Sequence, residues 1–304
     1  MAVVLGDFRQ ALQVRENTRG LRQSEAFFQH VQNLPALAEL LFAHTSGWTA
    51  AGICVSSRPR PLVDSYMPVF LPGLGLAKSL AAALNIPWSE TSHQENHIWA
   101  ALSTAPGLKD DVFLALHVSG GTTDLLLVKR CESDLEIEAL GTAGDLHAGQ
   151  FVDRIGVALG LHFPAGPQLE SLAALAGHDL QFPSVHSNGQ MSFSGPESAA
   201  RRAVDRAAPA DIAYSVFSCV ARTLEGVLLW AEKHTGCRSV LLAGGVMANR
   251  QIAGYLSERF AARLSLYSAT PKLSVDNAVG AAILALRRYG PVDRCWEGND
   301  TFES

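Results

Sequence analysis

Short apolar runs alternate with longer segments of helical periodicity, and this alternation limits the folds open to the chain. The strand-like runs are residues 50–57, 112–118, 125–129 and 240–243. The helix-like segments are residues 73–84, 145–159, 211–233 and 274–288. Strands that alternate with helices pack as layers of helix and sheet. The sequence therefore predicts an α/β architecture, with Ser274 as the N-cap of the last helix.

The composition predicts a folded chain and argues against several classes of function. Of 304 residues, 48% are hydrophobic, and 24 basic against 29 acidic residues give a formal net charge of −5. No run of basic residues favours diffuse binding to nucleic acid or to a membrane surface. We expect neither a signal peptide nor a membrane span, and the predicted location is the cytoplasm. Five widely spaced cysteines, an odd number, predict no disulfide framework.

Two histidines four residues apart carry the first chemical signal. On a helix, His93 and His97 would share one face, about 5–6 Å apart at Cβ, and could chelate one cation. A peptidase of the HExxH type needs a glutamate directly after the first histidine, but Gln94 stands there. Asp276 would complete a facial site for iron, zinc or a similar cation. The alternatives are two polar surface histidines and an acid favoured by the helix dipole.

Two glycine pairs follow predicted strands. Residues 119–121 form a tight turn whose backbone N–H groups could bind a phosphate, although a glycine-rich hairpin is also an ordinary turn. Gly244 and Gly245 lead from a buried strand into a helix predicted to start at Met247. Such a junction places nucleotides at the carboxyl edge of a sheet, the alternative being a simple tight connection.

The order of these motifs resembles that of one protein family. The sequence resembles tRNA threonylcarbamoyladenosine synthase subunits of the TsaD/Gcp type, once labelled O-sialoglycoprotein endopeptidases. The shared motifs, in chain order, are HxxxH, VSGG, an aspartate-bearing helix, P-x-G-P, FSG, AGGVxANR and a final DN pair. The resemblance covers nearly the whole chain. It implies an α/β actin-like ATPase fold, with two ribonuclease-H-like lobes around a nucleotide cleft. Residues 1–108 would form the first lobe and residues 109–304 the second, with a helical insertion at about 145–235.

The resemblance also implies a role for each motif. One divalent metal ion, iron or zinc with Mg²⁺ as a further option, would be held by His93, His97 and Asp276. An adenine nucleotide (ATP, AMP or threonylcarbamoyl-AMP) would be bound by residues of the other motifs: His117, Val118, Ser119, Gly120, Gly121, Asp153, Gly166, Gly244, Gly245 and Asn249. The implied reaction transfers a threonylcarbamoyl group to N6 of adenosine 37 of tRNA, or is a closely related carbamoyl transfer, without a covalent nucleophile.

Four departures from the family pattern predict a diverged, N-terminally shortened paralogue. The chain begins at Met1 without the family's opening strand and phosphate loop. Thr122 replaces the histidine of SGGHT, and Gln150 replaces a glutamate. Glu197 replaces the lysine of FSGLKT and inverts a charge near the cleft. These changes leave open a catalytically silent scaffold or partner subunit and, less favoured, a metallopeptidase. The expected partners are the nucleotide, tRNA bound through partner subunits, and an actin-like-fold chain in a homo- or heterodimer.

Overall fold

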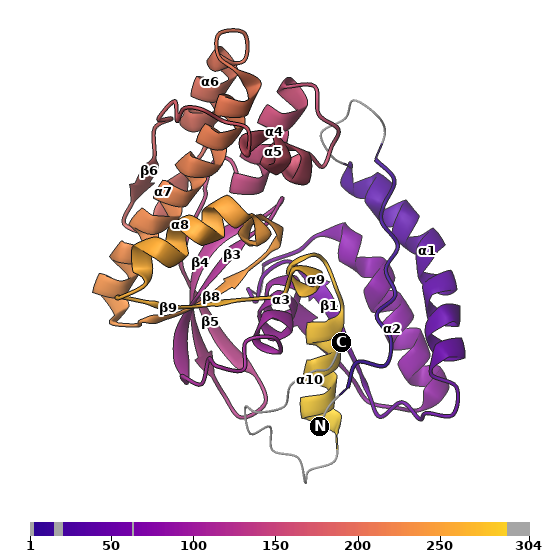
Figure 1. Cartoon of the computed structure of the whole chain (residues 1–304). Helices are drawn as coiled ribbons and strands as arrows, with labels where there is room; N and C mark the ends of the chain where they lie inside the picture. The colour runs from indigo at the N-terminus through magenta and orange to yellow at the C-terminus, as the bar shows by residue number, and fades with distance from the viewer. Residues whose placement is uncertain (1–2, 15–20, 63, 291–304) are drawn as a thin grey trace.

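The computed structural model describes residues 3–14, 21–62 and 64–290, and its main sheet has five strands in the order β5-β4-β3-β8-β9 (Figure 1). The strands are β3 (Val112–Val118), β4 (Thr123–Arg130), β5 (Leu135–Thr142), β8 (Ser239–Ala243) and β9 (Ser265–Ser268). β4 runs antiparallel to β3 and β5, whereas β8 runs parallel to β3 and to β9. Three consecutive strands, then helices, β8, a helix and β9 give the succession βββαβαβ in this sheet.

The residues of β3 alternate between the two faces of this sheet. Leu114 and Leu116 belong to one buried hydrophobic cluster, and Phe113 and Ala115 belong to another on the opposite face. Successive side chains of a strand point to opposite faces, so a strand that is apolar throughout must be covered on both sides. The sheet is accordingly the middle layer of three.

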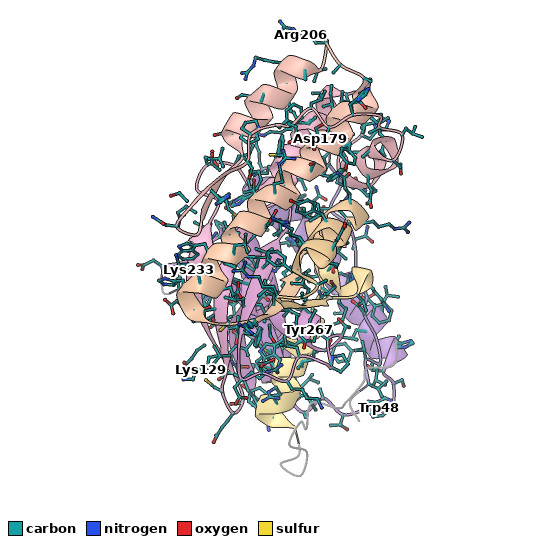
Figure 2. The ribbon with its side chains drawn as sticks, turned by 60° about the vertical axis from the view of Figure 1, so that its left-hand side comes forward. Trp48, Lys129, Asp179, Arg206, Lys233 and Tyr267 are labelled. Carbon is teal, nitrogen blue, oxygen red and sulfur yellow. The ribbon has the colours of Figure 1, made fainter. Side chains whose placement is uncertain are left out.

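Five α-helices contribute buried residues to the cluster that contains Leu114, and two α-helices contribute buried residues to the other. The first group is α4 (Ala148–Ala158), α5 (Gly166–Ala173), α6 (Ser194–Ala203), α7 (Pro209–Thr235) and α8 (Arg250–Phe260). The second group is α3 (His93–Leu102) and α10 (Val279–Tyr289). Figure 2 shows α7 extending from near Arg206 to Lys233 across the sheet. α7 is long and apolar enough to cross a membrane, but 72% of its most apolar window is buried inside this fold.

The N-terminal part of the chain carries a second, smaller sheet. β1 (Ile53–Arg58) and β2 (Trp88–Ser92) pair in parallel, and α1 (Gln23–His44), η1 (Pro68–Phe70) and α2 (Leu71–Leu84) pack beside them. Figure 1 shows α1 and α2 side by side, away from the main sheet. A short hairpin, β6 (Val185–Ser187) and β7 (Gln190–Ser192), lies beyond α5 in sequence. The division of the chain after residue 108, the insertion at about 145–235 and the lost first strand stay predictions.

Most expected elements are confirmed, and three details are wrong. The expected helix from Met247 is instead a short 3-10 helix, η2 (Gly245–Ala248), followed by α8. The expected last helix is divided into α9 (Pro271–Ser274) and α10, so Ser274 ends one helix and does not cap the next. The Asn277 side chain donates to the Leu273 and Val275 carbonyl oxygens and accepts from the Val279 amide, which replaces helical bonds and breaks the helix there.

Candidate metal and nucleotide site

His93, His97 and Asp276 converge on one point although 179 residues separate His97 from the carboxylate. The two Nε2 atoms lie 3.2 Å apart, and Asp276 Oδ1 lies 3.3 Å from His93 Nε2 and 3.2 Å from His97 Nε2. A four-coordinate ion with bonds of about 2.0–2.2 Å holds its ligand atoms about 3.3–3.5 Å apart. The spacing therefore fits one metal ion held by two imidazoles and a carboxylate.

Local structure explains how the histidines come to face one way. Ser92 caps α3, accepting from the Glu95 amide at 3.0 Å, and this places the two histidines one turn apart at the start of the helix. His97 is only 2% exposed, so the interpretation as a pair of surface histidines is wrong for His97. The His93 ring lies 5.8 Å from the Phe70 ring and remains partly exposed. One ligand is thus fixed in the core while the other faces the opening.

The helix break at Asn277 brings the carboxylate to the histidines. Because the chain is not helical between α9 and α10, Asp276 projects from a loop beside α3. Hydrogen bonds from His93 and His97 lower the pKa of Asp276, and they outweigh burial, which raises it. The carboxylate is therefore held as an anion, the form that coordinates a cation.

α3 and α10 cross closely enough to exclude any side chain at one position. A Cβ added at Gly280 would lie 1.9 Å from the Asn96 carbonyl oxygen. Asn96 itself donates from Nδ2 to the Asn277 carbonyl oxygen at 2.8 Å and accepts at Oδ1 from the Ala281 amide at 2.8 Å. These contacts fix the helix that bears the histidines against the loop that bears the carboxylate.

His117 lies next to the three candidate ligands, near the carboxyl end of β3. Its ring centroid is 4.8 Å from that of His97, and neither of its ring nitrogens has a hydrogen-bond partner among the described residues. Burial, followed by the charges of His97 and His93, lowers the pKa of His117 well below its usual value, so the ring is neutral. A neutral, buried imidazole without a partner is the kind of group that a ligand would satisfy.

The glycine turn after β3 lies beside the second glycine pair. The Ser119 amide donates to the Thr122 carbonyl oxygen at 2.8 Å, which closes the turn, and a Cβ on Gly120 or Gly121 would contact nothing within 4 Å. Gly244 has a φ of +95°, and a Cβ there would lie 2.3 Å from the Val118 carbonyl oxygen. Only glycine allows both that conformation and that approach. The open face of the turn and the Gly244–Gly245 junction are therefore adjacent.

The remaining candidate residues lie at or next to helix N-termini, with Asp153 reaching the start of α5 from the middle of α4. Asp153 Oδ1 accepts from the Ala165 amide at 2.8 Å, so the structure brings Asp153 and Gly166 together at the start of α5. Burial raises the pKa of Asp153 despite these backbone hydrogen bonds. Asn249 caps α8 by accepting from the Ile252 amide at 2.9 Å, while its Nδ2 is buried without a partner among the described residues. The free amide group is a further donor for a ligand.

Comparison with known proteins decides the family. The sequence profile of the family described as TsaD, tRNA N6-adenosine threonylcarbamoyltransferase, matches residues 11–283. The chain belongs to this family. A tRNA N6-adenosine threonylcarbamoyltransferase of Thermus thermophilus is 34% identical over 294 residues, covering 94% of this chain and 86% of that protein. The enzyme of the same name from Bacillus subtilis is 32% identical over 266 residues, covering 82% of this chain and 73% of that protein.

Solved structures agree with the family on the fold. HypF of T. kodakarensis superimposes with a TM-score of 0.63 at 18% identity over 86% of this chain and 43% of HypF. A structure of full-length HypF in a phosphate- and nucleotide-bound form gives a TM-score of 0.60 at 15% identity, and the match covers 86% of this chain and 42% of HypF. The predicted α/β actin-like ATPase fold and the TsaD resemblance are confirmed. So is the predicted enzyme class, a transferase of the family that makes threonylcarbamoyladenosine in tRNA.

Two departures from the family pattern have local structural counterparts. Glu197 is nearly buried and accepts from Arg201 Nε at 2.5 Å, so the charge that replaces a lysine is paired within α6. The inverted charge is thus balanced by a basic side chain one turn further along the same helix. Gln150 Oε1 accepts from the His147 amide at 3.3 Å at the start of α4, a bond that a glutamate would also make.

One network of this TsaD-family chain was not predicted from the sequence. Asp124, buried in β4, accepts hydrogen bonds from Gln94, Thr142 and Arg60, which come from three separate segments. An acid in an otherwise apolar strand is a signal of such a network, because a buried charge must be paired. The identity of the partners depends on tertiary structure.

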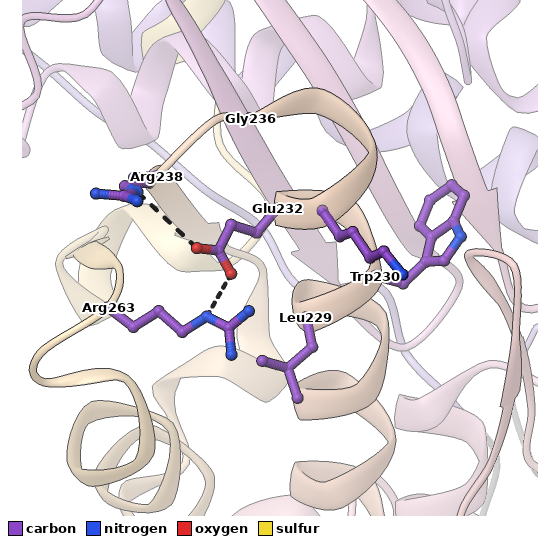
Figure 3. A pocket seen from close by; sticks show the side chains of 7 residues that line it. Leu229, Trp230, Glu232, Gly236, Arg238 and Arg263 are labelled. Atoms are coloured by element: carbon purple, nitrogen blue, oxygen red, sulfur yellow. Dashed lines mark hydrogen bonds and ion pairs between the residues drawn. The ribbon is translucent and has the colours of Figure 1, made fainter.

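A surface pocket at the C-terminal end of α7 is separate from the candidate site (Figure 3). Its Glu232 carboxylate accepts from Arg263 Nε at 2.5 Å and lies 3.9 Å from Arg238 Nε. The pocket adjoins the start of β8, whereas the glycine turns lie at the carboxyl ends of β3 and β8. The pocket therefore lies at the amino end of β8, whereas the metal ligands lie near the carboxyl ends of the strands. Its Glu232 is already paired with arginine side chains.

Proposed function

We propose that this chain transfers the threonylcarbamoyl group of threonylcarbamoyl-AMP to N6 of adenosine 37 in tRNA, using the His93, His97 and Asp276 site. The observation that carries the proposal is the convergence of these three ligand atoms, each within 3.3 Å of the others, in a chain of the TsaD family. In the transfer, the N6 amine attacks the carbamoyl carbon, the bond to the phosphate oxygen breaks, AMP leaves with the electron pair, and N6 loses a proton.

The donor set indicates which metal the site would hold. Two imidazole nitrogens and one carboxylate oxygen suit iron or zinc, whereas Mg²⁺ prefers oxygen ligands. When bound, such an ion supplies Lewis-acid polarisation of a substrate oxygen. The buried His97 would fix its position, and the neutral His117 beside it would donate or accept a hydrogen bond at the substrate rather than add a positive charge.

The nucleotide would lie across the glycine turn, between the metal ligands and the N-termini of α5 and α8. We assign the phosphate to the end of β3 and the glycine turn that follows it. The residues are His117, Val118, Ser119, Gly120 and Gly121. Asp153 and Gly166, adjacent at the start of α5, would contact the ribose and the nucleoside. Gly244, Gly245 and the free Nδ2 of Asn249 would close the other side.

The tRNA would be bound with help from other subunits. With a net charge of −5, the chain offers little general attraction for a polyanion, so a partner would supply the basic surface. We propose an actin-like-fold partner in a homo- or heterodimer, and a cytoplasmic location for the assembly.

The test is modification of tRNA by the metal-loaded protein with threonylcarbamoyl-AMP, with and without its partner subunits. Nucleoside analysis of unmodified tRNA should show threonylcarbamoyladenosine with the unchanged chain and none with His97→Ala. The matched control, His178→Ala, removes an exposed histidine far from the site in sequence and should retain activity. If the loaded protein binds metal and AMP but leaves tRNA unmodified with every partner combination, the alternative of a silent scaffold subunit replaces the proposal.

A further inference from the structure

Arg60 is held beside the candidate site by a buried carboxylate. Its Nη2 donates to Asp124 Oδ1 at 3.0 Å, and Asp124 is 2% exposed while Arg60 is 40% exposed. The pair joins the loop after β1 to the strand that follows the glycine turn. The charged end of Arg60 is thus anchored on one side and accessible on the other.

Asp124 does not depend on Arg60 alone. Gln94 Nε2 donates to Oδ2 at 2.8 Å, and the Thr142 hydroxyl donates to Oδ1 at 2.7 Å. Arg60, in turn, uses only Nη2 for this carboxylate, and its Nε and Nη1 have no hydrogen-bond partner among the residues that the structure describes. A guanidinium has five N–H donors in a fixed fork, so most of its binding capacity remains unused.

The backbone around Arg60 is fixed against the helix that bears the histidines. The Pro59 carbonyl oxygen accepts from the Gln94 amide at 3.0 Å, and the Arg60 amide donates to the Ser65 hydroxyl at 3.0 Å. On the other side, Asp124 is paired in register with His117 across the β3–β4 hairpin. Arg60 is therefore located between the first turn of α3 and the glycine turn.

We propose that Arg60 binds an oxyanion of the substrate, either the phosphate or the threonyl carboxylate of the carbamoyl-adenylate. This inference rests on the proposed function. Arginine binds phosphate and carboxylate through paired, charge-assisted hydrogen bonds, and a guanidinium already oriented by Asp124 loses little conformational freedom on binding. A purely structural Arg60 would stabilise the fold by neutralising Asp124 but would not change the affinity for anions.

Calorimetric titration of four probes into the metal-loaded protein distinguishes these roles. The probes are AMP, adenosine, N-carbamoyl-L-threonine and its carboxamide. In Arg60→Gln we expect affinity for AMP or for N-carbamoylthreonine to fall by about tenfold or more, with adenosine and the carboxamide unchanged. Loss confined to AMP assigns the phosphate, and loss confined to carbamoylthreonine assigns the carboxylate.

The matched control is Arg58→Gln. Arg58 is two residues away, is 37% exposed and pairs with Glu90 at 3.7 Å, so it differs in position but not in charge or accessibility. It should leave all four affinities unchanged. Equal affinities of unchanged protein and Arg60→Gln for both anions would overturn the inference and leave the proposed function intact. Failure of the unchanged protein to bind any probe would overturn both.

A second variant covers the case in which Arg60→Gln folds poorly. Combining Arg60→Gln with Asp124→Asn removes the buried charge that would otherwise lose a partner. The double variant should recover the folded signal and still bind the anionic probe about tenfold more weakly than the unchanged protein. Recovery of affinity together with the fold would show that Arg60 acts only through Asp124.

Discussion

Asn96 and Asn277, 181 residues apart, are joined by a hydrogen bond of 2.8 Å from the Asn96 side chain to the Asn277 carbonyl oxygen. The same Asn96 side chain accepts from the Ala281 amide, so it orders both the loop that carries Asp276 and the start of α10. A side chain that orients a metal ligand contributes to metal affinity without touching the ion.

Asn96→Ala should therefore weaken metal binding as well as the fold. The buried Ala281 amide and the partly buried Asn277 carbonyl oxygen lose their partner, which costs about 2–4 kcal/mol of the free energy of unfolding. Metal affinity should fall about 10- to 100-fold, as measured by competition with a chelating dye. Thr223→Val is the control, because it removes another buried hydrogen bond, to the Cys219 carbonyl oxygen in α7. A similar loss of metal affinity in that control would attribute the effect to general destabilisation.

Gly280→Ala should destabilise the protein even though alanine favours helices. The added Cβ would lie 1.9 Å from the Asn96 carbonyl oxygen and 3.0 Å from the Ala100 amide nitrogen, so α3 and α10 would have to move apart. We expect a loss of about 1–3 kcal/mol in chemical denaturation. Gly254→Ala in α8 is the matched substitution, since its Cβ would contact nothing within 4 Å, and it should stabilise the protein by about 0.5–1 kcal/mol. Equal effects of the two changes would contradict the close crossing.

Metal binding should stabilise the folded chain. At a free Zn²⁺ concentration about 100 times the Kd, the free energy of unfolding should rise by about 2.7 kcal/mol. His97→Ala should remove this increment, because it deletes the buried ligand of the three. Urea denaturation with Zn²⁺ and with a chelator measures the difference. An increment that persists in His97→Ala would locate the bound ion elsewhere.

Asp145 should make stability depend on pH. It accepts hydrogen bonds from the Ser192 and Ser194 hydroxyls and from the backbone amides of Leu146, Phe193 and Ser194. Burial raises the pKa of Asp145, but these hydrogen bonds outweigh it and hold the pKa below its usual value of about 3.9. The carboxylate therefore stabilises the fold above about pH 4, and this contribution is lost as the pH falls toward the folded-state pKa.

Asp145→Asn should thus be less stable than the unchanged protein at pH 7, by about 1 kcal/mol because the group is exposed. The difference in free energy of unfolding between the two proteins should become smaller below about pH 4. Denaturation curves of both proteins at about pH 7, 5 and 3.5 measure this difference. Ser194→Ala, which removes one donor, should show a smaller pH dependence than the unchanged protein. If the difference in free energy of unfolding does not change with pH, the Asp145 side chain stabilises the fold through its shape and not through its charge.

Local sequence patterns predicted the elements whose structure depends on neighbours in the chain. The β3–β4 hairpin follows from two apolar runs around a glycine turn, and α7 follows from helical periodicity. The helix break at Asn277 was not predicted, because the helical pattern of the sequence is continuous across residues 274–288. The break is caused by three hydrogen bonds of the Asn277 side chain, which the pattern does not reveal. The burial of His97 was also missed, since its ring packs against His117 of β3, a contact that depends on tertiary structure.

The metal ligands could be named from a resemblance, but their convergence could not be derived from spacing. His93 and His97 are local to one helix, whereas the distance to Asp276 depends on how α10 docks. Arg60 illustrates the same limit. Nothing near residue 60 in the sequence indicates that its guanidinium meets Asp124, 64 residues later, through a contact between the small sheet and the main one.

The separation of the metal ligands along the chain has a consequence for how the protein is made. His97 leaves the ribosome 179 residues before Asp276, a delay of about 10–40 s at ordinary rates of synthesis. Nascent chains arrested before and after Asp276 and α10 have left the ribosome should differ in retained metal, with ions held only by the longer ones. The site is therefore complete only after Asp276 has been made and α10 has packed against α3, and a retained cation reports that this packing has occurred.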